Sequence, residues 1–218
     1  MPQSNRPYTG FFLTVEGGEG CGKSTLCDSL TQELGKRGYN VVRTREPGGT
    51  ALSEHLRGIV LSPKKPFPIG ERTEMLLFLT ARVQHLDELI LPALRAGKVV
   101  ICERFNDSTF AYQACARHLG YADVELLCRL VCNHIEPDCT LLLDIDPAVG
   151  LQRIKGRAID RLEQEELQFH KDVRQGYLHL LDKYSERIHL VDATPDPKTV
   201  FGAALALLDN YITVKPCG

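Results

Sequence analysis

A glycine-rich segment near the N-terminus carries the strongest chemical signal in the sequence. Residues 17–24 read Gly-Gly-Glu-Gly-Cys-Gly-Lys-Ser and match the pattern G-x-x-x-x-G-K-[ST]. Glycines let successive backbone N–H groups curve around phosphate oxygens, and a following helix adds a favourable potential for an anion. Lys23 would reach the β- and γ-phosphates, and the Ser24 hydroxyl would bind Mg²⁺. The segment predicts a nucleoside-triphosphate site made of Gly17, Gly18, Glu19, Gly20, Cys21, Gly22, Lys23, Ser24 and Thr25.

Three further segments carry cations that phosphoryl transfer needs to neutralise charge. Arg45 follows the second predicted strand and precedes a Pro-Gly-Gly turn, which suits an anion grip above the sheet. After the third predicted strand, Glu103 could hold a magnesium-bound water and Arg104 a phosphate. The stretch 153–161 crosses a glycine, which suits a closing lid, and it contributes Arg153, Arg157 and Arg161.

Each of these segments also has a simpler interpretation. The Pro-Gly-Gly stretch could be only a turn, residues 103–104 only a surface ion pair, and the basic stretch a solvated helix face. Their joint occurrence at strand ends around a phosphate loop favours the functional interpretation. The sequence lacks the Asn-Lys-x-Asp motif with which P-loop GTPases read guanine, so a transferase is favoured over a GTPase.

Averages over the whole chain limit the classes of function. The 218 residues fit one ordinary domain, and 43% hydrophobic with 25% charged residues argues against general disorder. The net charge of -2 argues against a nonspecific nucleic-acid binder. No apolar run approaches the roughly 20 residues of a membrane span, and residues 1–8 lack the apolar segment of a secretory signal. We expect a cytoplasmic protein with no nucleic-acid or membrane partner.

The eight cysteines form no C-x-x-C pair and show no Cys/His spacing typical of zinc. Without a secretory signal, a disulfide framework is not expected in a chain of this size. We predict buried, reduced thiols. Cys21 is the exception, because the helix-terminal potential at the phosphate loop predicts a more thiolate-like sulfur there.

Short β-rich runs alternate with amphipathic stretches along the chain. The runs predict strands at residues 11–15, 41–44, 98–102, 139–145 and 188–191. The helical patterns cover residues 23–36, 51–61, 71–96, 108–118, 124–132, 148–155, 165–184 and 198–211, with a proline-rich loop at 64–70. The 71–96 pattern predicts one long helix that tolerates Pro92. This alternation predicts a doubly wound α/β domain. Together with the phosphate loop and the basic stretch, it leads us to expect an α/β P-loop NTPase fold, a five-stranded parallel sheet flanked by helices with a short lid at about 153–163, in a single domain over residues 1–218.

Several motifs resemble the thymidylate kinase family. They are Thr-Arg-Glu-Pro-Gly-Gly-Thr at 44–50, Ser-Thr-Phe-Ala-Tyr-Gln at 108–113 after an acid–Arg–aromatic triplet, Asp-Arg-Leu-Glu at 160–163, and Val-Asp-Ala-Thr at 191–194. The matches run from Phe12 to about Thr194 in the order of the family. The resemblance implies an enzyme that transfers the γ-phosphoryl group of ATP to dTMP, giving dTDP and ADP, with Mg²⁺ as cofactor.

The resemblance also implies roles for individual residues around dTMP. Glu19 would meet the sugar 3′-hydroxyl, and Arg45 and Arg104 would hold the phosphate. The base and sugar would be read by Phe78, stacked on thymine, by Arg82 at O4, by Thr109 and Gln113 at the base edge, and by Tyr112 at the 2′ position. For Phe78 the alternative is plain core packing, whereas burying an unpaired Arg82 in an apolar helix would be costly.

The family divides by the position of its catalytic arginine. The phosphate loop here has none, so the chain resembles the bacterial type with arginines in the lid. Asp160-Arg161 matches the family best, but the choice among the lid arginines stays open. The expected catalytic set is Lys23, Arg104, Arg153, Arg157 and Arg161, and the expected metal site is Ser24 with Glu103.

The chain departs from the family at two positions. Glu103 stands where Asp is usual, and Phe105 where Tyr or His is usual. The resemblance further implies a homodimer. Rival functions left open by the residues are another P-loop kinase acting on dUMP, dCMP or a deoxynucleoside, a noncatalytic nucleotide-binding switch, and a P-loop motor or transport ATPase.

Overall fold

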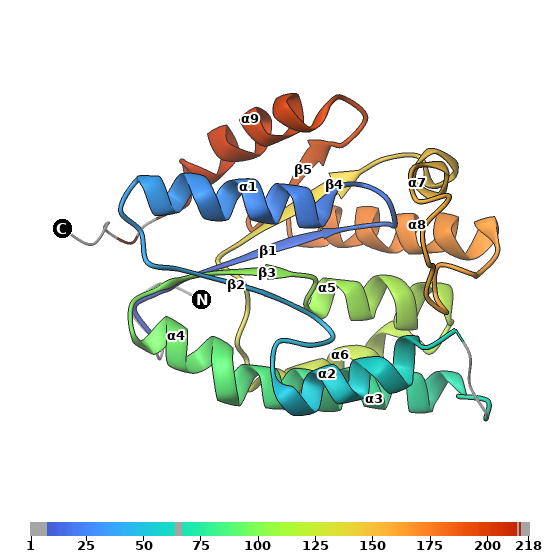
Figure 1. Ribbon diagram of the computed structural model, residues 1–218. Coiled ribbons are helices and arrows are strands. Elements are labelled where there is room, and N and C mark those ends of the chain that lie inside the picture. The colour runs from blue at the N-terminus through green and yellow to red at the C-terminus, as the bar shows by residue number, and fades with distance from the viewer. Residues whose placement is uncertain (1–7, 64–66, 213, 215–218) are drawn as a thin grey trace.

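The computed structural model describes residues 8–63, 67–212 and 214. Its described residues form a five-stranded parallel sheet in the order β2-β3-β1-β4-β5 (Figure 1). The strands are β1 (Phe11–Gly17), β2 (Val41–Arg45), β3 (Val99–Glu103), β4 (Cys139–Asp144) and β5 (Ile188–Asp192). The five strands predicted from sequence are all present, and the α/β fold with a parallel sheet is confirmed.

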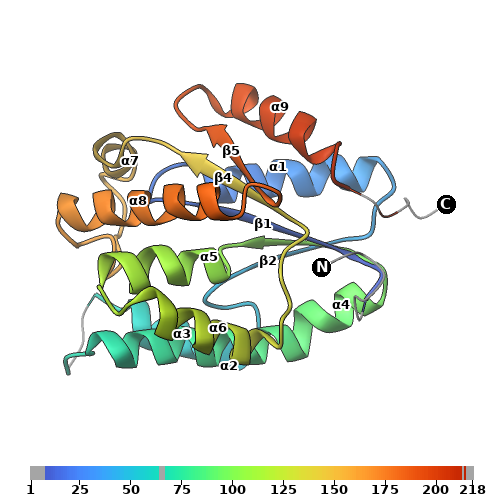
Figure 2. The same ribbon diagram turned by 180° about the vertical axis from the view of Figure 1, so that it is seen from behind.

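Helices cover both faces of the sheet (Figures 1 and 2). One face carries α1 (Lys23–Lys36) and α9 (Pro197–Leu208). The helices on the other side are α3 (Glu71–His85), α4 (Leu91–Arg95), α5 (Asn106–Thr109), α6 (Tyr121–Cys132) and α8 (Leu167–Lys183). Two further helices flank the carboxyl ends of the strands, α2 (Ala51–Leu61) and α7 (Pro147–Arg153).

Because side chains alternate in direction along a strand, buried residues pack on both faces of the sheet. In β1, Phe11 and Leu13 pack against α1 and α9, whereas Phe12 packs on the opposite side with Leu94 and other residues of the long helix. All seven residues of β1 are buried. A strand buried on both faces needs apolar side chains at odd and even positions alike, which is why β1 is mostly apolar, with Thr14 and Glu16 as its buried polar residues.

The long helix expected at 71–96 is interrupted. It consists of α3, a π-helical segment η2 (Leu86–Ile90) and α4. Pro92, at the start of α4, has no N–H and its ring crowds the carbonyl four residues earlier, so a wider turn just before it relieves the conflict. The helix expected at 108–118 likewise consists of α5 and a π segment η3 (Phe110–Ala116). In the loop expected at 64–70, residues 64–66 lie outside the described residues and 67–70 have no regular structure.

The seven described cysteines are free thiols, and all but Cys115 are buried. Cys217 lies outside the described residues. No helix within the described ranges is both long and apolar enough to cross a bilayer.

Candidate active site

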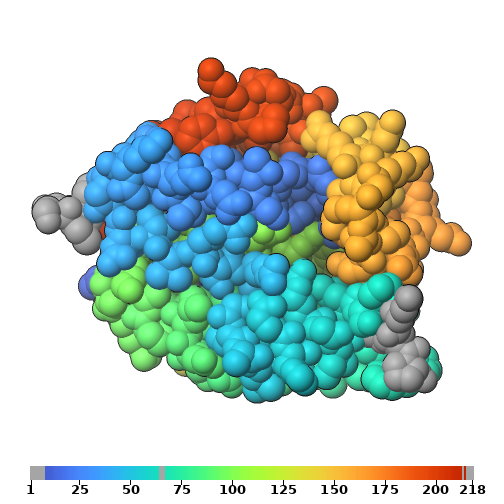
Figure 3. Space-filling model, in the orientation of Figure 1, coloured from blue at the N-terminus to red at the C-terminus, as the bar shows by residue number. Residues whose placement is uncertain are grey.

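A cleft of about 620 Å³ opens at the carboxyl ends of β1, β2 and β3. In the space-filling view it lies between α1 and α2, with the lid segment at one side (Figure 3). Parallel pairing places Glu103 beside Arg45 on one neighbouring strand and beside Val15 on the other. The sequence-predicted residues that line the cleft are Glu19, Gly20, Gly22, Lys23, Ser24, Thr25, Arg45, Phe78, Arg82, Glu103, Arg104, Thr109, Tyr112, Gln113, Arg153 and Arg157.

The phosphate loop connects β1 to α1 with its lysine folded inward. Gly20 and Gly22 adopt φ of 68° and 94°, which favour glycine. A Cβ on Gly20 would lie 2.0 Å from the carbonyl oxygen of Gly150, so the loop also needs glycine there for space. Lys23 is buried, and its Nζ donates to the carbonyl of Gly18 at 2.6 Å. The ammonium group is therefore held across the loop, where bound phosphates would meet it.

Ser24 and Glu103 are in direct contact at the wall of the cleft. The Ser24 hydroxyl donates to Oε1 of Glu103 at 2.9 Å, and Nη2 of Arg43 lies 3.4 Å from Oε2. A hydroxyl and a carboxylate are the hard oxygen ligands that Mg²⁺ prefers. This donor set fits the ion that the sequence implied, and the longer Glu103 side chain still reaches Ser24.

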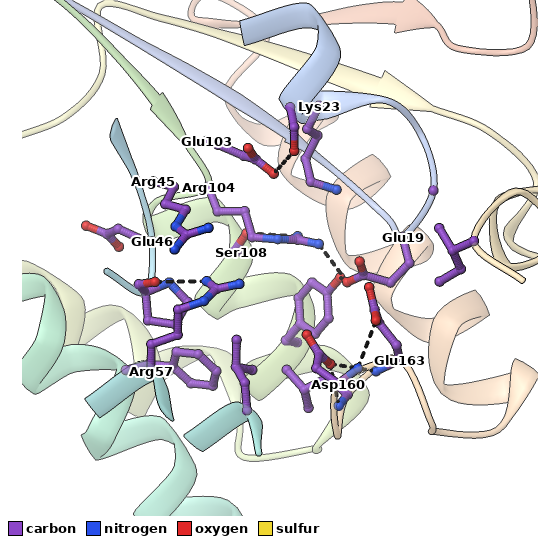
Figure 4. A pocket seen from close by; sticks show the side chains of 18 of the residues that line it. Glu19, Lys23, Arg45, Glu46, Arg57, Glu103, Arg104, Ser108, Asp160 and Glu163 are labelled. Atoms are coloured by element: carbon purple, nitrogen blue, oxygen red, sulfur yellow. Dashed lines mark hydrogen bonds and ion pairs between the residues drawn. The ribbon is translucent and has the colours of Figure 1, made fainter. Parts of the chain in front are cut away.

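Glu19 is tied to two residues of the opposite wall. Its Oε1 accepts hydrogen bonds from Arg104 Nη2 and from the Tyr112 hydroxyl, both at 2.6 Å (Figure 4). Burial alone would raise the pKa of Glu19, but the charges of Arg104 and Lys23 outweigh it and lower the pKa to about 2. Glu19 is thus an ionised acceptor, suited to a sugar hydroxyl.

A buried carboxylate that the sequence analysis missed, Glu16, supports the turn that presents Arg104. Arg104 has a φ of 67°, an unusual conformation for a residue other than glycine. Glu16 accepts from the backbone N–H of the next residue, Phe105, at 2.6 Å, and from the hydroxyls of Ser108 at 2.6 Å and Tyr177 at 2.9 Å. The sequence feature that could have identified Glu16 is an acidic residue inside a mostly apolar strand, just before the phosphate loop.

A second missed residue, Arg57, lies near Arg45 on the cleft wall (Figure 4). Arg45 pairs with Glu54 at 3.1 Å, while Arg57 donates to the carbonyl of Pro47 at 2.9 Å. Burial and the charge of Arg45 lower the pKa of Arg57, because two cations in one place repel. A bound anion would relieve this repulsion. The sequence feature that could have identified Arg57 is that it is the one Lys or Arg in residues 51–61.

Arg82 is buried, and all but one of its N–H groups are hydrogen-bonded within the described part of the chain. It donates from Nε to Glu46 at 2.6 Å, from Nη1 to Asn106 and Thr109, and from Nη2 to the carbonyl of Phe105. These bonds use four of its five N–H groups. The remaining Nη2 N–H has no partner among the described residues, and Arg82 lines the cleft. The charge is thus compensated while one donor is left for a ligand.

Phe78 on α3 lines the cleft while also packing against the edge of the buried cluster that contains Leu79. Phe78 is half-buried and lines the cleft, whereas its neighbour Leu79 is 2% exposed and packs inside the helical layer. Thr109, Tyr112 and Gln113 approach the same region from α5 and η3. The base-reading residues expected from the resemblance therefore all line the same cleft.

The lid arginines are held in three different ways. Arg153 donates to the backbone carbonyls of Ala193 and Thr194, each at 2.9 Å. Arg157 pairs with Glu163 at 2.5 Å and its side chain is 55% exposed. Arg161 contacts Glu74 on α3 and does not line the cleft. The best-matched lid arginine thus points away from the phosphate loop.

Three of the predicted loop residues also lie outside the cleft lining. Gly17 and Gly18 border a small hollow behind the loop. Cys21 is buried beneath it, with its thiol directed to the carbonyl of Gly18 at 3.1 Å. Further cleft residues are Arg43, which the sequence did not suggest, and Glu46, Ser108, Asp160 and Glu163, which lie in the family motifs without an assigned role.

Comparison with known proteins identifies the family. The family model described as thymidylate kinase matches residues 15–203. A thymidylate kinase of Protochlamydia amoebophila is 45% identical over 96% of both chains, and one of a Geobacillus species is 43% identical over 93% of this chain and 98% of its own. The chain belongs to the thymidylate kinase family. The crystal structure of thymidylate kinase from Ehrlichia chaffeensis agrees, with a TM-score of 0.77 and 30% identity over 91% of this chain and 98% of that one.

Membership of the thymidylate kinase family sets the class of reaction. The chain is an ATP-dependent nucleoside monophosphate kinase, a phosphotransferase, and the reaction that the family name specifies converts dTMP to dTDP. The rival interpretations as a switch or as a motor ATPase are excluded by this membership. The P-loop NTPase fold expected from the sequence is that of the structural relative.

One departure from the thymidylate kinase pattern has a structural explanation. Phe105 is fully buried, with its ring 5.0 Å from that of Phe12 in an edge-on arrangement and 5.2 Å from the guanidinium of Arg82. Aromatic packing and the cation over the ring both favour an apolar ring at this position.

Proposed function

We propose that the cleft binds ATP on the phosphate loop and dTMP between α2, α3 and η3, and that the chain transfers the γ-phosphoryl group directly between them. The observation that carries this proposal is the facing arrangement of cations. Lys23 stands on the loop side, and Arg45, Arg57 and Arg104 surround the opposite part of the same cleft. Two polyanions can approach each other only where such positive charge offsets their repulsion.

The acceptor would lie with its phosphate on Arg45, Arg57 and Arg104. The lowered pKa of Arg57 supports this placement, since that cation is short of a counter-charge. The sugar 3′-hydroxyl would donate to the ionised Glu19, which Arg104 already orients at 2.6 Å. Tyr112, bound to the same carboxylate, would close the space beside the sugar and favour deoxyribose.

The base would stack on Phe78 and be read by Arg82, Thr109 and Gln113. The remaining N–H of Arg82 fits a single carbonyl oxygen, as thymine offers at O4. Cytosine carries an amino group at the same place and would leave that N–H unpaired. A buried unpaired donor is costly, so we expect a strong preference for dTMP over dCMP.

Ser24 and Glu103 would hold Mg²⁺, and their 2.9 Å contact supports this role. Bound there, the ion would neutralise charge on the ATP phosphates. No general base is needed, because the phosphate acceptor is already anionic. The chain's own contribution is to position both substrates, to exclude water with the lid and to neutralise developing charge through Lys23 and the lid arginines.

Among the lid arginines we propose Arg157 as the one that approaches the transferred group. It lines the cleft, and its exposed side chain pairs with Glu163 inside the lid, whereas the other two arginines contact residues outside the lid. Arg153 also lines the cleft and would add positive charge from its fixed position. Arg161, held by Glu74, would act by anchoring the lid.

An ADP-release assay with dTMP, dCMP and thymidine as acceptors tests the proposal. The wild-type chain should release ADP fastest with dTMP and only slowly with the other two. Arg45→Ala should mainly raise the KM for dTMP, and Arg157→Ala should mainly lower kcat, by about a hundredfold. If Arg161→Ala lowers kcat while Arg157→Ala does not, the assignment within the lid is wrong. Undiminished turnover in all three variants would overturn the site.

We further propose a single domain over residues 1–218, a cytoplasmic location and a homodimer, as the family resemblance implies. Large apolar side chains are exposed on neighbouring helices of one side, with Leu76 on α3 51% exposed and Leu126 and Leu130 on α6 59% and 69% exposed. Exposed apolar groups of this kind favour association. Light scattering coupled to size-exclusion chromatography should give twice the chain mass, and a monomer at all concentrations would contradict the proposal.

A further inference from the structure

Glu74 on α3 is a buried carboxylate that joins two parts of the site. Its side chain is 1% exposed and lies one helical turn before Phe78. Oε1 accepts a hydrogen bond from Nε2 of Gln113 at 2.9 Å. Oε2 contacts Arg161 of the lid and lies 3.3 Å from Arg117. Glu74 does not line the cleft and has no direct role in the phosphoryl transfer.

The charge of Glu74 decides which end of the Gln113 amide it can hold. Burial would raise the pKa of Glu74, but the hydrogen bond from Arg161 and the charge of Arg117 lower it below its ordinary value. An ionised carboxylate only accepts hydrogen bonds. It must therefore face the NH₂ group of the amide, and the opposite orientation would set two acceptors against each other.

The orientation of the NH₂ group also determines which way the oxygen of the Gln113 amide faces. The Gln113 side chain is buried and lines the cleft. No described residue donates to its Oε1, so with the NH₂ group held by Glu74 this oxygen is an acceptor available to a ligand. Pyrimidines with a 4-oxo group carry a hydrogen on N3 and donate there, whereas cytosine presents a bare N3 that accepts.

We propose that Glu74 is a positioning residue for acceptor selection: it fixes the Gln113 amide with its oxygen toward the base, so that N3–H of a 4-oxo pyrimidine is accepted and cytosine is rejected. This inference rests on the proposed placement of the base beside Phe78 and Gln113. It adds a second selection to the single N–H of Arg82, at a different atom of the ring. Arg82 tests position 4, and the amide fixed by Glu74 tests position 3.

The same carboxylate also anchors Arg161, so the two effects must be separated. Arg161→Gln removes the lid contact and leaves the bond between Glu74 and Gln113 in place. Arg117→Gln removes the other cation, which reaches neither the base nor the cleft lining. These two variants are the matched controls for any general effect on the lid or on stability.

The decisive variant is Glu74→Gln, whose neutral amide can donate to Gln113 and so permits the opposite orientation. The quantity measured is the ratio of kcat/KM for dTMP to that for dCMP, with labelled product separated by anion exchange. We expect this ratio to fall about tenfold in Glu74→Gln, the effect of one reversed hydrogen bond. It should stay within about twofold of wild type in Arg161→Gln and Arg117→Gln, even where kcat falls.

A merely structural role predicts a different result, in which Glu74→Gln slows both acceptors equally and the ratio is unchanged. That result would overturn the inference. If Glu74→Gln does not fold, Glu74→Asp serves, because it keeps the charge for the arginines but withdraws the carboxylate from Gln113. Its ratio should also fall, and an unchanged ratio would again overturn the inference. A wild-type chain with no preference for dTMP would instead contradict the proposed function itself.

Discussion

Arg82 donates from Nε to Oε2 of Glu46 over 2.6 Å, and both side chains are almost fully buried. Glu46 also contacts His85 at 3.1 Å, and the second ring nitrogen of His85 lies 2.6 Å from the hydroxyl of Thr44. This chain of contacts ties the end of β2 to α3. Because Arg45 lies between Thr44 and Glu46, the group proposed for the phosphate and the group proposed for the base keep a fixed separation.

Removing the charge of Glu46 should strongly destabilise the fold. In Glu46→Gln the buried Arg82 loses its counter-ion, and breaking one partner of a buried pair costs about 3 kcal/mol or more. Urea unfolding measures this loss. Glu33→Gln removes a partly exposed partner of Arg37 at the end of α1 and should change the free energy of unfolding by less than about 0.5 kcal/mol. Equal effects in the two variants would contradict the central place of the Glu46 contact.

Arg57 provides a test of the acceptor phosphate site. In Arg57→Ala we expect the KM for dTMP to rise about tenfold or more, because a charge-assisted contact is lost. The KM for ATP should change by less than about twofold. Steady-state kinetics with each substrate varied in turn distinguishes the two. The control is Arg129→Ala on α6, whose exposed arginine pairs with Glu125; a similar rise there would point to a general charge effect.

Phe78 and Leu79 are neighbours with opposite expected effects. Phe78→Ala removes the proposed stacking surface, which is worth about 1–3 kcal/mol per base, so the KM for dTMP should rise with little loss of stability. Leu79→Ala creates a cavity in the helical layer and should cost about 2–5 kcal/mol of stability. Thermal unfolding and dTMP kinetics on both variants check the contrast. A large loss of stability in Phe78→Ala would favour core packing instead.

Glu16 should make stability fall as pH rises. Burial, reinforced by the charge of Asp107, raises the pKa of Glu16 from its ordinary 4.5 to about 7. Between these values the folded protein holds more protons than the unfolded chain, so its free energy of unfolding decreases with increasing pH. At about 1.4 kcal/mol per pKa unit, the decrease amounts to about 3 kcal/mol.

The variant Glu16→Gln cannot titrate and should lack this decrease. The comparison is the urea-unfolding free energy of both proteins between pH 5 and pH 8. Wild type should lose stability relative to Glu16→Gln up to about pH 7 and run parallel above it. Glu19, with its pKa lowered to about 2, stays ionised throughout this range and adds no slope. Parallel curves across the whole range would contradict a raised pKa at Glu16.

Local patterns predicted the parts of the site that lie close together in the chain. The phosphate loop is continuous, Arg45 and Glu103 are the last residues of the paired strands β2 and β3, and Arg104 follows directly, so strand pairing alone brings them to one edge. Residue types at strand ends were therefore sufficient to place these groups. The order of the strands was not needed to infer that they meet.

Contacts between distant segments could not be predicted in the same way. The bond between Arg82 and Glu46 joins residues 36 positions apart, and helical periodicity does not say which acid meets a buried arginine. Arg161 matched the family pattern best but contacts Glu74, because its direction depends on how the lid meets α3. The two π segments, η2 and η3, likewise arise from packing, which for η2 includes the conflict at Pro92. Helical periodicity in the sequence does not predict them.

The two carbonyl contacts of Arg153 have a consequence for movement of the lid. Arg153 is bonded to Ala193 and Thr194 at the end of β5, whereas the chain turns at Gly156 with a φ of 94° before Arg157. The end of β5 therefore restrains Arg153, and a displacement of the lid would begin beyond it. Opening for product release would then withdraw Arg157 but leave Arg153 beside the phosphates, so the departing ADP would lose only part of its positive surroundings at that step.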